Sequence, residues 1–235
     1  GVCIADEVQV GFARTGATFW AFQNLGAVPD IVASAKAAGN GFPLGFVACR
    51  REIAESFAAT SAFFSTAGGN PVSCRVGEAV LDVIADEGLR ENAASVGDRI
   101  AAGLAELADR HPVIGATYGL GLYQGIDLVE RPGDDRRPLR PERVADICER
   151  LLELGIVEQP TGVLGNVLKV KPPLCIRPED ADRYLSCLDR VLTEFEELDA
   201  LVAATSAGAG GGVRSGISGR SDGSCTAGPV DATRG

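Results

Sequence analysis

Short apolar runs that end close to polar residues restrict the fold of this sequence more than any other feature. Residues 1–5 (GVCIA) lead directly into Asp6. Residues 31–33 (IVA) are soon followed by Lys36, and residues 44–49 form a third run. Runs of this length and character are typical of buried strands, and ligands bind at the carboxyl ends of strands in open α/β sheets. The sequence therefore predicts three strands, of which the first is buried, with Asp6 and Lys36 each at the end of a strand.

The rest of the chain, up to residue 202, alternates between helical and strand-like patterns. Asn70-Pro71 offers a cap and a first-turn proline for a helix, and Gly88 ends that helix. The other predicted elements are helices over residues 89–109 and 141–154 and from 178 onward, and strands over 113–117, 122–129 and 167–170. From residue 203 onward Gly, Ala and Ser predominate. Such a segment buries too little apolar surface to offset its ordering entropy, so we expect residues 203–235 to be disordered.

Lysine is scarce in this sequence, although basic residues are not. Of the 22 basic residues only Lys36, Lys169 and Lys171 are lysines, and the others are arginines. The sequence therefore uses arginine wherever only a positive charge is needed. An amine can be deprotonated and can form a Schiff base, which a guanidinium cannot do. The three lysines are accordingly candidates for amine chemistry.

Composition disfavours several classes of function. The formal net charge of −10 argues against a nucleic-acid partner, because phosphate binding needs clustered Lys and Arg. No apolar run of about eighteen residues is present to span a membrane. His111 is the only histidine, which rules out a zinc site with several histidines. We expect it to be a surface residue or a residue at the carboxyl end of a helix, and not a catalytic base. Seven cysteines without a C-x-x-C pair indicate reduced thiols and a cytoplasmic protein.

Three clusters of polar residues lie at predicted strand ends or turns, namely residues 6–9 (DEVQ), Lys36 and residues 65–71 (STAGGNP). A pyridoxal phosphate enzyme needs a lysine amine, a carboxylate that keeps the ring nitrogen protonated, an apolar residue against the ring, and donors for the phosphate. The clusters contain all four. A strand that ends in Asp6-Glu7 also resembles the magnesium-binding strand of P-loop ATPases, but the sequence has no G-x-x-x-x-G-K-[ST].

With their flanking residues, these clusters point to one family. Residues 4–16 (IADEVQVGFARTG), residues 29–32 (PDIV) leading to Lys36, and residues 66–71 (TAGGNP) follow one another in the chain. In order and spacing they resemble the class III aminotransferases of fold type I, which are pyridoxal 5'-phosphate-dependent. The resemblance covers roughly residues 1–200.

The resemblance implies roles for five residues. Lys36 forms the Schiff base with pyridoxal 5'-phosphate, and Asp6 pairs with the pyridinium nitrogen. Val8 packs on the ring, and Gln9 approaches the ring hydroxyl. Thr66 binds the phosphate of the neighbouring subunit's cofactor, which implies a homodimer.

The resemblance also implies an α/β fold of the fold type I pyridoxal phosphate-dependent transferases. Residues 1–75 correspond to the carboxyl-terminal part of an incomplete cofactor-binding large domain, and residues 76–202 to the small α+β domain, before the tail at 203–235. The amino-terminal half of the family, with its Gly/Ser phosphate loop and its stacking aromatic residue, has no counterpart here. We therefore expect this chain to be a piece of a longer protein.

Within the family, residues 19–23, 39–43 and 166–175 look most like one branch, which contains alanine–glyoxylate aminotransferases and phospho-lyases. Many members have arginine where Lys169 stands, to hold a substrate carboxylate in a bidentate pair that lysine cannot form. We expect an aminotransferase that acts between an amino acid or amine and a keto acid, with Lys169 as a candidate substrate contact. The alternatives are a phospho-lyase acting on an amino-alkyl phosphate, or an inactive fragment of such an enzyme.

Overall fold

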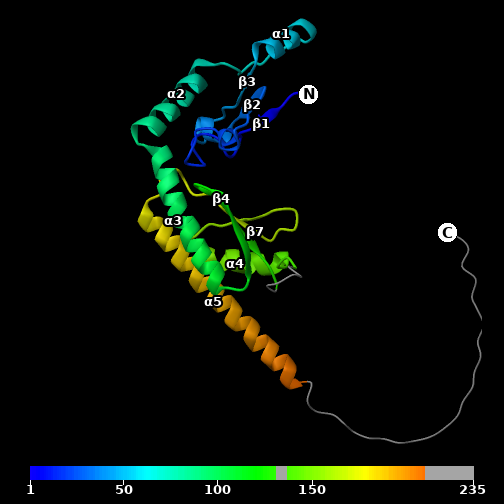
Figure 1. The fold of residues 1–235 in the computed structure, drawn as a ribbon, viewed down its shortest axis with the longest axis vertical. Helices are drawn as coiled ribbons and strands as arrows, with labels where there is room; N and C mark the ends of the chain where they lie inside the picture. Colours follow the sequence, from blue (N-terminus) through cyan, green and yellow to red (C-terminus); the bar gives the residue numbers. More distant parts are fainter. Residues whose placement is uncertain (131–136, 210–235) are drawn as a thin grey trace, which may run out of the picture. The chain divides into compact units, whose positions relative to one another are not determined.

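The computed structural model describes residues 1–130 and 137–209, and Figure 1 shows its elements. The chain divides into two compact units, Gly1–Glu197 and Leu198–Gly235. All elements that position the candidate site belong to the first unit. No helix in the described part of the chain is long and apolar enough to cross a membrane.

A three-stranded sheet carries two of the predicted site residues at its ends. β1 (Ile4–Asp6) pairs in parallel with β2 (Ile31–Ser34), and β2 pairs antiparallel with β3 (Phe46–Cys49). The three predicted strands are confirmed. The predicted burial of the first run is wrong, because β1 is a short edge strand and Val2 and Ile4 are 59% and 62% exposed.

Two 3-10 helices lie between the strands of this sheet, and three α-helices follow it in the chain. The 3-10 helices η1 (Ala21–Leu25) and η2 (Lys36–Gly39) and the helix α1 (Arg51–Thr60) were not anticipated from the sequence pattern. The predicted cap is confirmed, because α2 (Pro71–Asp86) begins where the Asn70 Oδ1 atom accepts a hydrogen bond from the Ser73 N–H, at 2.9 Å. Gly88, with φ of +60°, separates α2 from α3 (Leu89–Arg110).

A second, antiparallel sheet forms the core with three helices. Its strands are β4 (Ile114–Leu120), β5 (Tyr123–Leu128), β6 (Pro160–Thr161) and β7 (Val167–Val170), in the order β4-β5-β7-β6. The helices α3, α4 (Pro141–Glu153) and α5 (Pro178–Ala209) contribute to one buried cluster with this sheet, and Figure 1 shows α3 and α5 running side by side. Leu168 and Val170 of β7 face this core. Because side chains alternate along a strand, Lys169 points to the opposite face.

Two glycines let the loop of residues 11–16 lie directly against α3 and the turn between β4 and β5. A Cβ atom on Gly97 of α3 would lie 2.5 Å from the Gly121 carbonyl oxygen, and one on Gly121 would lie 2.5 Å from the Thr15 carbonyl carbon. The Leu122 N–H donates a hydrogen bond to the Arg14 carbonyl oxygen at 3.0 Å. The loop, the β4–β5 turn and α3 are thus stacked backbone on backbone, which fixes the first sheet relative to the second.

The prediction for the carboxyl-terminal segment is partly wrong. Helix α5 continues through residues 203–209, which had been expected to be disordered. Alanine has the highest helix propensity of all residues, and this part of the tail is rich in alanine. Residues 210–235 lie outside the described residues, as do residues 131–136 of the predicted loop after β5.

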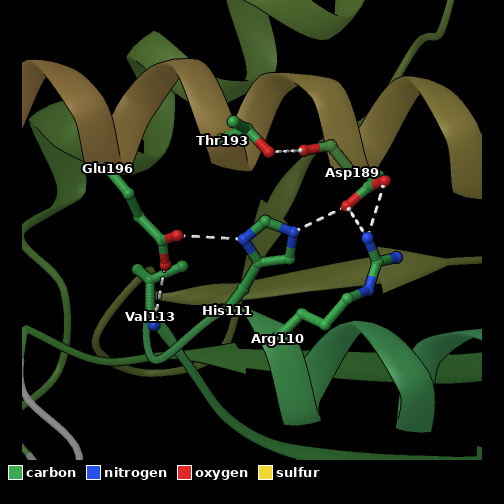
Figure 2. Close-up of polar contacts among 6 residues, drawn as sticks. All are labelled: Arg110, His111, Val113, Asp189, Thr193 and Glu196. Atoms are coloured by element: carbon green, nitrogen blue, oxygen red, sulfur yellow. Dashed lines mark hydrogen bonds and ion pairs between the residues drawn. The ribbon is translucent and has the colours of Figure 1, made fainter.

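His111 lies at the end of a helix, one of the two positions expected for it, and it is buried and not at the surface. It follows α3 as expected, but it is only 4% exposed, because its ring lies between two carboxylates of α5 (Figure 2). Nε2 is 2.8 Å from Asp189 Oδ1, and Nδ1 is 3.0 Å from Glu196 Oε2. Each ring nitrogen thus has a carboxylate oxygen of α5 within hydrogen-bonding distance. His111 therefore joins the end of α3 to α5.

His111→Leu is expected to lower the free energy of unfolding by about 2 kcal/mol, because both partly buried carboxylates lose their hydrogen bond to the ring. The matched control is Arg110→Gln, which removes an exposed partner of the same Asp189 and should cost less than about 1 kcal/mol. Urea denaturation of the two variants measures the difference. Equal losses in the two variants would show that the buried ring contributes no more than a surface ion pair.

Candidate functional site

The structure brings Asp6 and Lys36 to one edge of the first sheet. Strands β1 and β2 run parallel with Asp6 opposite Ala33, so their carboxyl ends lie together. Lys36 begins η2 just beyond the end of β2, and its backbone is in the left-handed region, with φ of +39°. Such a backbone is unusual for a residue with a side chain and is found preferentially at functional sites. The predicted juxtaposition of an amine and a carboxylate is therefore present in the described fold.

The two adjacent carboxylates of Asp6 and Glu7 have different surroundings. Glu7 is buried, and its carboxylate accepts hydrogen bonds from the backbone N–H groups of Ala21 and Phe22, at 2.9 and 2.8 Å. It therefore holds the start of η1, a role that the sequence analysis did not identify. Asp6 is exposed, and its Oδ1 accepts a hydrogen bond from the Val8 N–H at 3.1 Å. Its Oδ2 atom makes no hydrogen bond to a described residue, so Asp6 is the carboxylate available to a ligand.

Hydrogen bonds also hold the loops after β1 and β2 together. The Glu7 N–H donates to the Ala33 carbonyl oxygen at 2.9 Å. The Ser34 hydroxyl, which is buried, donates to the Glu7 carbonyl oxygen at 3.4 Å. Because these bonds link the residues next to Asp6 and Lys36, they fix the two loops that carry the candidate groups.

All three lysines of the chain lie in one electrostatic neighbourhood. The Lys171 Nζ atom is 3.4 Å from Gln9 Oε1, to which it donates a hydrogen bond. Burial lowers the pKa of the Lys171 ammonium group, and the charges of Lys169, Lys36 and Arg14 lower this pKa further. None of the three lysines forms a salt bridge with a carboxylate among the described residues. Positive charges that gather in this way favour an anionic ligand.

Arg14 connects the two sheets as well as adding charge to this neighbourhood. Its guanidinium donates hydrogen bonds to the carbonyl oxygens of Leu122, at 3.5 Å, and Pro172. Burial lowers the pKa of Arg14, although an arginine side chain remains charged in proteins. Since Pro172 follows Lys171 directly, Arg14 fixes the end of β7, and with it the lysines, beside the loop of residues 6–9.

Val8 and Thr66 are the two remaining residues that were predicted to contact the cofactor. Val8 is half-buried beside Asp6, in the same turn. Thr66 lies in the exposed segment between α1 and α2, and no described hydrogen bond joins it to Asp6 or Lys36. Its predicted ligand belongs to a neighbouring subunit, and its role stays a prediction.

A half-buried carboxyl group lies next to Lys169, and the sequence analysis missed it. Glu158 accepts hydrogen bonds from the Tyr184 hydroxyl at 3.2 Å and from the Gln159 N–H at 3.3 Å. Burial raises the pKa of Glu158 to about 7, although the charge of Lys169 and both hydrogen bonds act in the opposite direction. Glutamate in a polar loop gives no sequence signal of this kind, because the burial comes from α5, which is distant in the chain.

Glu158→Gln is expected to raise the free energy of unfolding at pH 8 by up to about 3 kcal/mol and to leave it unchanged near pH 4. An unfolded chain loses this proton near pH 4.5, whereas the folded chain keeps it up to about pH 7. Between these values the folded state binds more protons, so stability falls as pH rises and the full penalty applies above pH 7. Gln has no charge to desolvate. Urea denaturation at both pH values, with the exposed Glu106→Gln as control, measures the effect, and equal stabilisation at both pH values would contradict it.

The donor set fits pyridoxal phosphate in part. The Lys36 amine, the unpaired oxygen of the Asp6 carboxylate and the Gln9 amide lie around one edge of the first sheet. The hydrogen bond from Lys171 to Gln9 joins this edge to the second sheet. These groups suit the aldehyde and the ring of the cofactor. For the cofactor's phosphate, Thr66 is the candidate that the sequence offers.

Comparisons with known proteins agree with this geometry. The family model described as "Aminotransferase class-III" matches residues 2–192. An "Alanine--glyoxylate aminotransferase 2-like" protein of Drosophila melanogaster is 43% identical over 216 residues, which cover 88% of this chain and 43% of the relative. "Ethanolamine-phosphate phospho-lyase homolog 1" of Caenorhabditis elegans is 40% identical over 195 residues, which cover 82% of this chain and 42% of the relative. The chain therefore spans about two fifths of the length of these relatives.

Solved structures show the same partial match. A phospholyase from Arthrobacter in complex with phosphoethanolamine superposes with a TM-score of 0.78 at 37% identity, over 82% of this chain and 45% of that chain. The taurine:2-oxoglutarate aminotransferase of Bifidobacterium kashiwanohense, in complex with PLP and glutamate, superposes with a TM-score of 0.76 at 26% identity, over 83% of this chain and 44% of that chain. The predicted α/β fold class is thereby confirmed, with part of the fold present.

Proposed function

Because this chain belongs to the class III aminotransferase family, we propose that it supplies Lys36 and Asp6 to a pyridoxal phosphate site that transfers an amino group between an amino acid or amine and a keto acid. The observation that carries the proposal is the shared sheet edge, where parallel pairing brings Asp6 and Lys36 together. A related aminotransferase of the same fold binds PLP and glutamate.

The residues at this edge have distinct roles in the proposed reaction. Pyridoxal phosphate, when bound, supplies an electron sink for a carbanion. Lys36 Nζ would bind the cofactor and would then move the substrate's α-proton as a general base. Asp6 Oδ2 would accept a hydrogen bond from the ring nitrogen and keep it protonated. Val8 would pack on the ring, and Gln9 would bind the ring hydroxyl.

The proposed site includes a second copy of the chain. Thr66 lies in an exposed segment, and no described hydrogen bond joins it to Asp6 or Lys36 of its own chain. We assign it to the phosphate of a cofactor held by a neighbouring subunit, which makes the protein a homodimer. The division into a large domain at 1–75 and a small domain at 76–202 is part of the same proposal, as is a cytoplasmic location.

A second candidate function is elimination of phosphate from an amino-alkyl phosphate. The observation that favours it is the group formed by Lys169, Lys171 and Arg14, whose charges lie close enough to affect one another. Lysine acts as a point charge on phosphate and does not form the bidentate pair that arginine makes with a carboxylate. The Arthrobacter phospholyase that superposes on this chain was solved with phosphoethanolamine.

Two assays separate these functions. The chain is incubated with pyridoxal phosphate and either phosphoethanolamine, with inorganic phosphate as the readout, or alanine and glyoxylate, with pyruvate as the readout. Pyruvate that forms only with glyoxylate supports amino transfer. Phosphate release without a keto acid would overturn it in favour of elimination. If neither product forms, this chain, which spans part of the length of its relatives, is inactive on its own.

A further inference from the structure

Glu158 and Lys169 occupy the same pocket, although they lie on different segments. The Lys169 N–H donates a hydrogen bond to the carbonyl oxygen of Gln159, at 3.5 Å, so the residue after Glu158 pairs with β7. Both side chains line a pocket of about 520 Å³. The other lining residues are Ile100, Gly155, Ile156, Val157, Val170, Lys171, Pro172, Pro173, Cys175, Ile176, Asp180 and Tyr184. The mechanism proposed above makes no use of Glu158.

Among Glu158 and the groups that face it, Glu158 is the one that changes charge near neutral pH. Tyr184 faces it from α5, and burial raises the pKa of that hydroxyl well above its usual value. Cys148 faces it from α4, and burial raises the pKa of that thiol to about 11. Lys169 faces it from β7, and its positive charge acts on the carboxyl group. Lys171 and Asp180 lie farther along the same pocket wall.

We propose that Glu158 is a positioning residue for Lys169: its ionised carboxylate attracts the ammonium group, and its neutral form leaves that charge available to the anionic group of a substrate. Glu158 does not touch the substrate in this account. It sets how much of the Lys169 charge the substrate anion experiences. The consequence for substrate binding rests on the proposed function, in which Lys169 contacts the substrate.

The scarcity of lysine gives a direct test, because chain labelled with ¹³C-lysine yields signals from only Lys36, Lys169 and Lys171. Single Lys→Arg variants assign the three Cε–Hε signals. In a titration between about pH 5 and pH 9, the Lys169 signal is expected to shift with a midpoint near pH 7, the value for Glu158. That inflection should vanish in Glu158→Gln. An unchanged inflection in Glu158→Gln, or none in the unmodified chain, would overturn the proposal.

Tyr184→Phe is the second variant, since it keeps the carboxyl group. The Tyr184 hydrogen bond lowers the pKa of Glu158, so its loss should move the Lys169 midpoint to higher pH. A midpoint that stays fixed or moves lower would show that the titrating group is not Glu158. A role confined to packing would leave the lysine signals without any such movement.

Sulfate, whose charge is constant in this pH range, probes the effect on an anion. Its dissociation constant should be about two- to fivefold lower at pH 6 than at pH 8, the size expected for one partly solvated charge pair, and the ratio should be near one in Glu158→Gln. The same ratio in both proteins would contradict a role for Glu158. These measurements need no pyridoxal phosphate, so failure of Lys36 to bind the cofactor would refute the proposed function and leave this result standing.

Discussion

Lys36→Arg is expected to abolish attachment of pyridoxal phosphate to this chain and to lower any amino-transfer activity by about 10⁴-fold or more, as loss of a nucleophile does in other enzymes. Arginine keeps the positive charge but has no amine that can be deprotonated. Lys36 is also the lysine at the carboxyl end of β2, next to Asp6. The visible absorbance of the chain mixed with cofactor measures attachment.

The matched control is Lys171→Arg, which changes a second lysine of the same neighbourhood. It should retain the absorbance band, because Lys171 is assigned to charge and to the Gln9 hydrogen bond, and not to the amine that binds the cofactor. Loss of the band in both variants would show that either substitution disturbs the site, and would not single out Lys36. Retention of the band in Lys36→Arg would refute the role of Lys36.

Gly97→Ala is expected to lower the free energy of unfolding by about 3 kcal/mol or more, at the upper end of the usual range for overpacked sites. The added Cβ would lie 2.5 Å from the Gly121 carbonyl oxygen. Gly121 is itself stacked on the backbone of Thr15, so the turn cannot retreat without moving the loop that carries Arg14. Urea denaturation gives the loss, and a change in cofactor affinity would show whether the site loop moves.

Gly103→Ala on the same helix serves as the control. Its Cβ would meet only the side chain of Leu185, which can rotate away, and alanine favours the helix by up to about 1 kcal/mol. The loss should therefore be much smaller than for Gly97→Ala. Equal losses at the two positions would contradict the close backbone approach at Gly97.

The sequence predicted the local elements well because their signals are local. The Asn70 cap, the apolar stripe of α3 and the Gly88 break each lie within a few residues of the structure that they cause. The 3-10 helix η2 and the left-handed backbone of Lys36 were not predicted, because neither has a distinctive local pattern. Residues 203–209 are helical but were predicted to be disordered, because their composition is similar to that of the rest of the tail.

The parts of the site that the sequence missed depend on contacts between distant segments. Glu158 is buried by Tyr184, and His111 by Asp189 and Glu196, in each case residues of α5. The Glu7 carboxylate accepts its hydrogen bonds from backbone N–H groups at the start of η1. By contrast, Asp6 and Lys36 were predicted together because each follows an apolar strand, and parallel pairing of those strands then places them at one edge.

Reductive trapping tests the central claim most directly. The chain is mixed with an equimolar amount of pyridoxal phosphate, reduced with borohydride and digested, and the lysine that carries the cofactor is identified by mass spectrometry. Because the chain has only three lysines, each has a distinct outcome. The account predicts that the cofactor is attached to Lys36 alone. Attachment to Lys169 or Lys171, equal labelling of all three, or no attachment would contradict it.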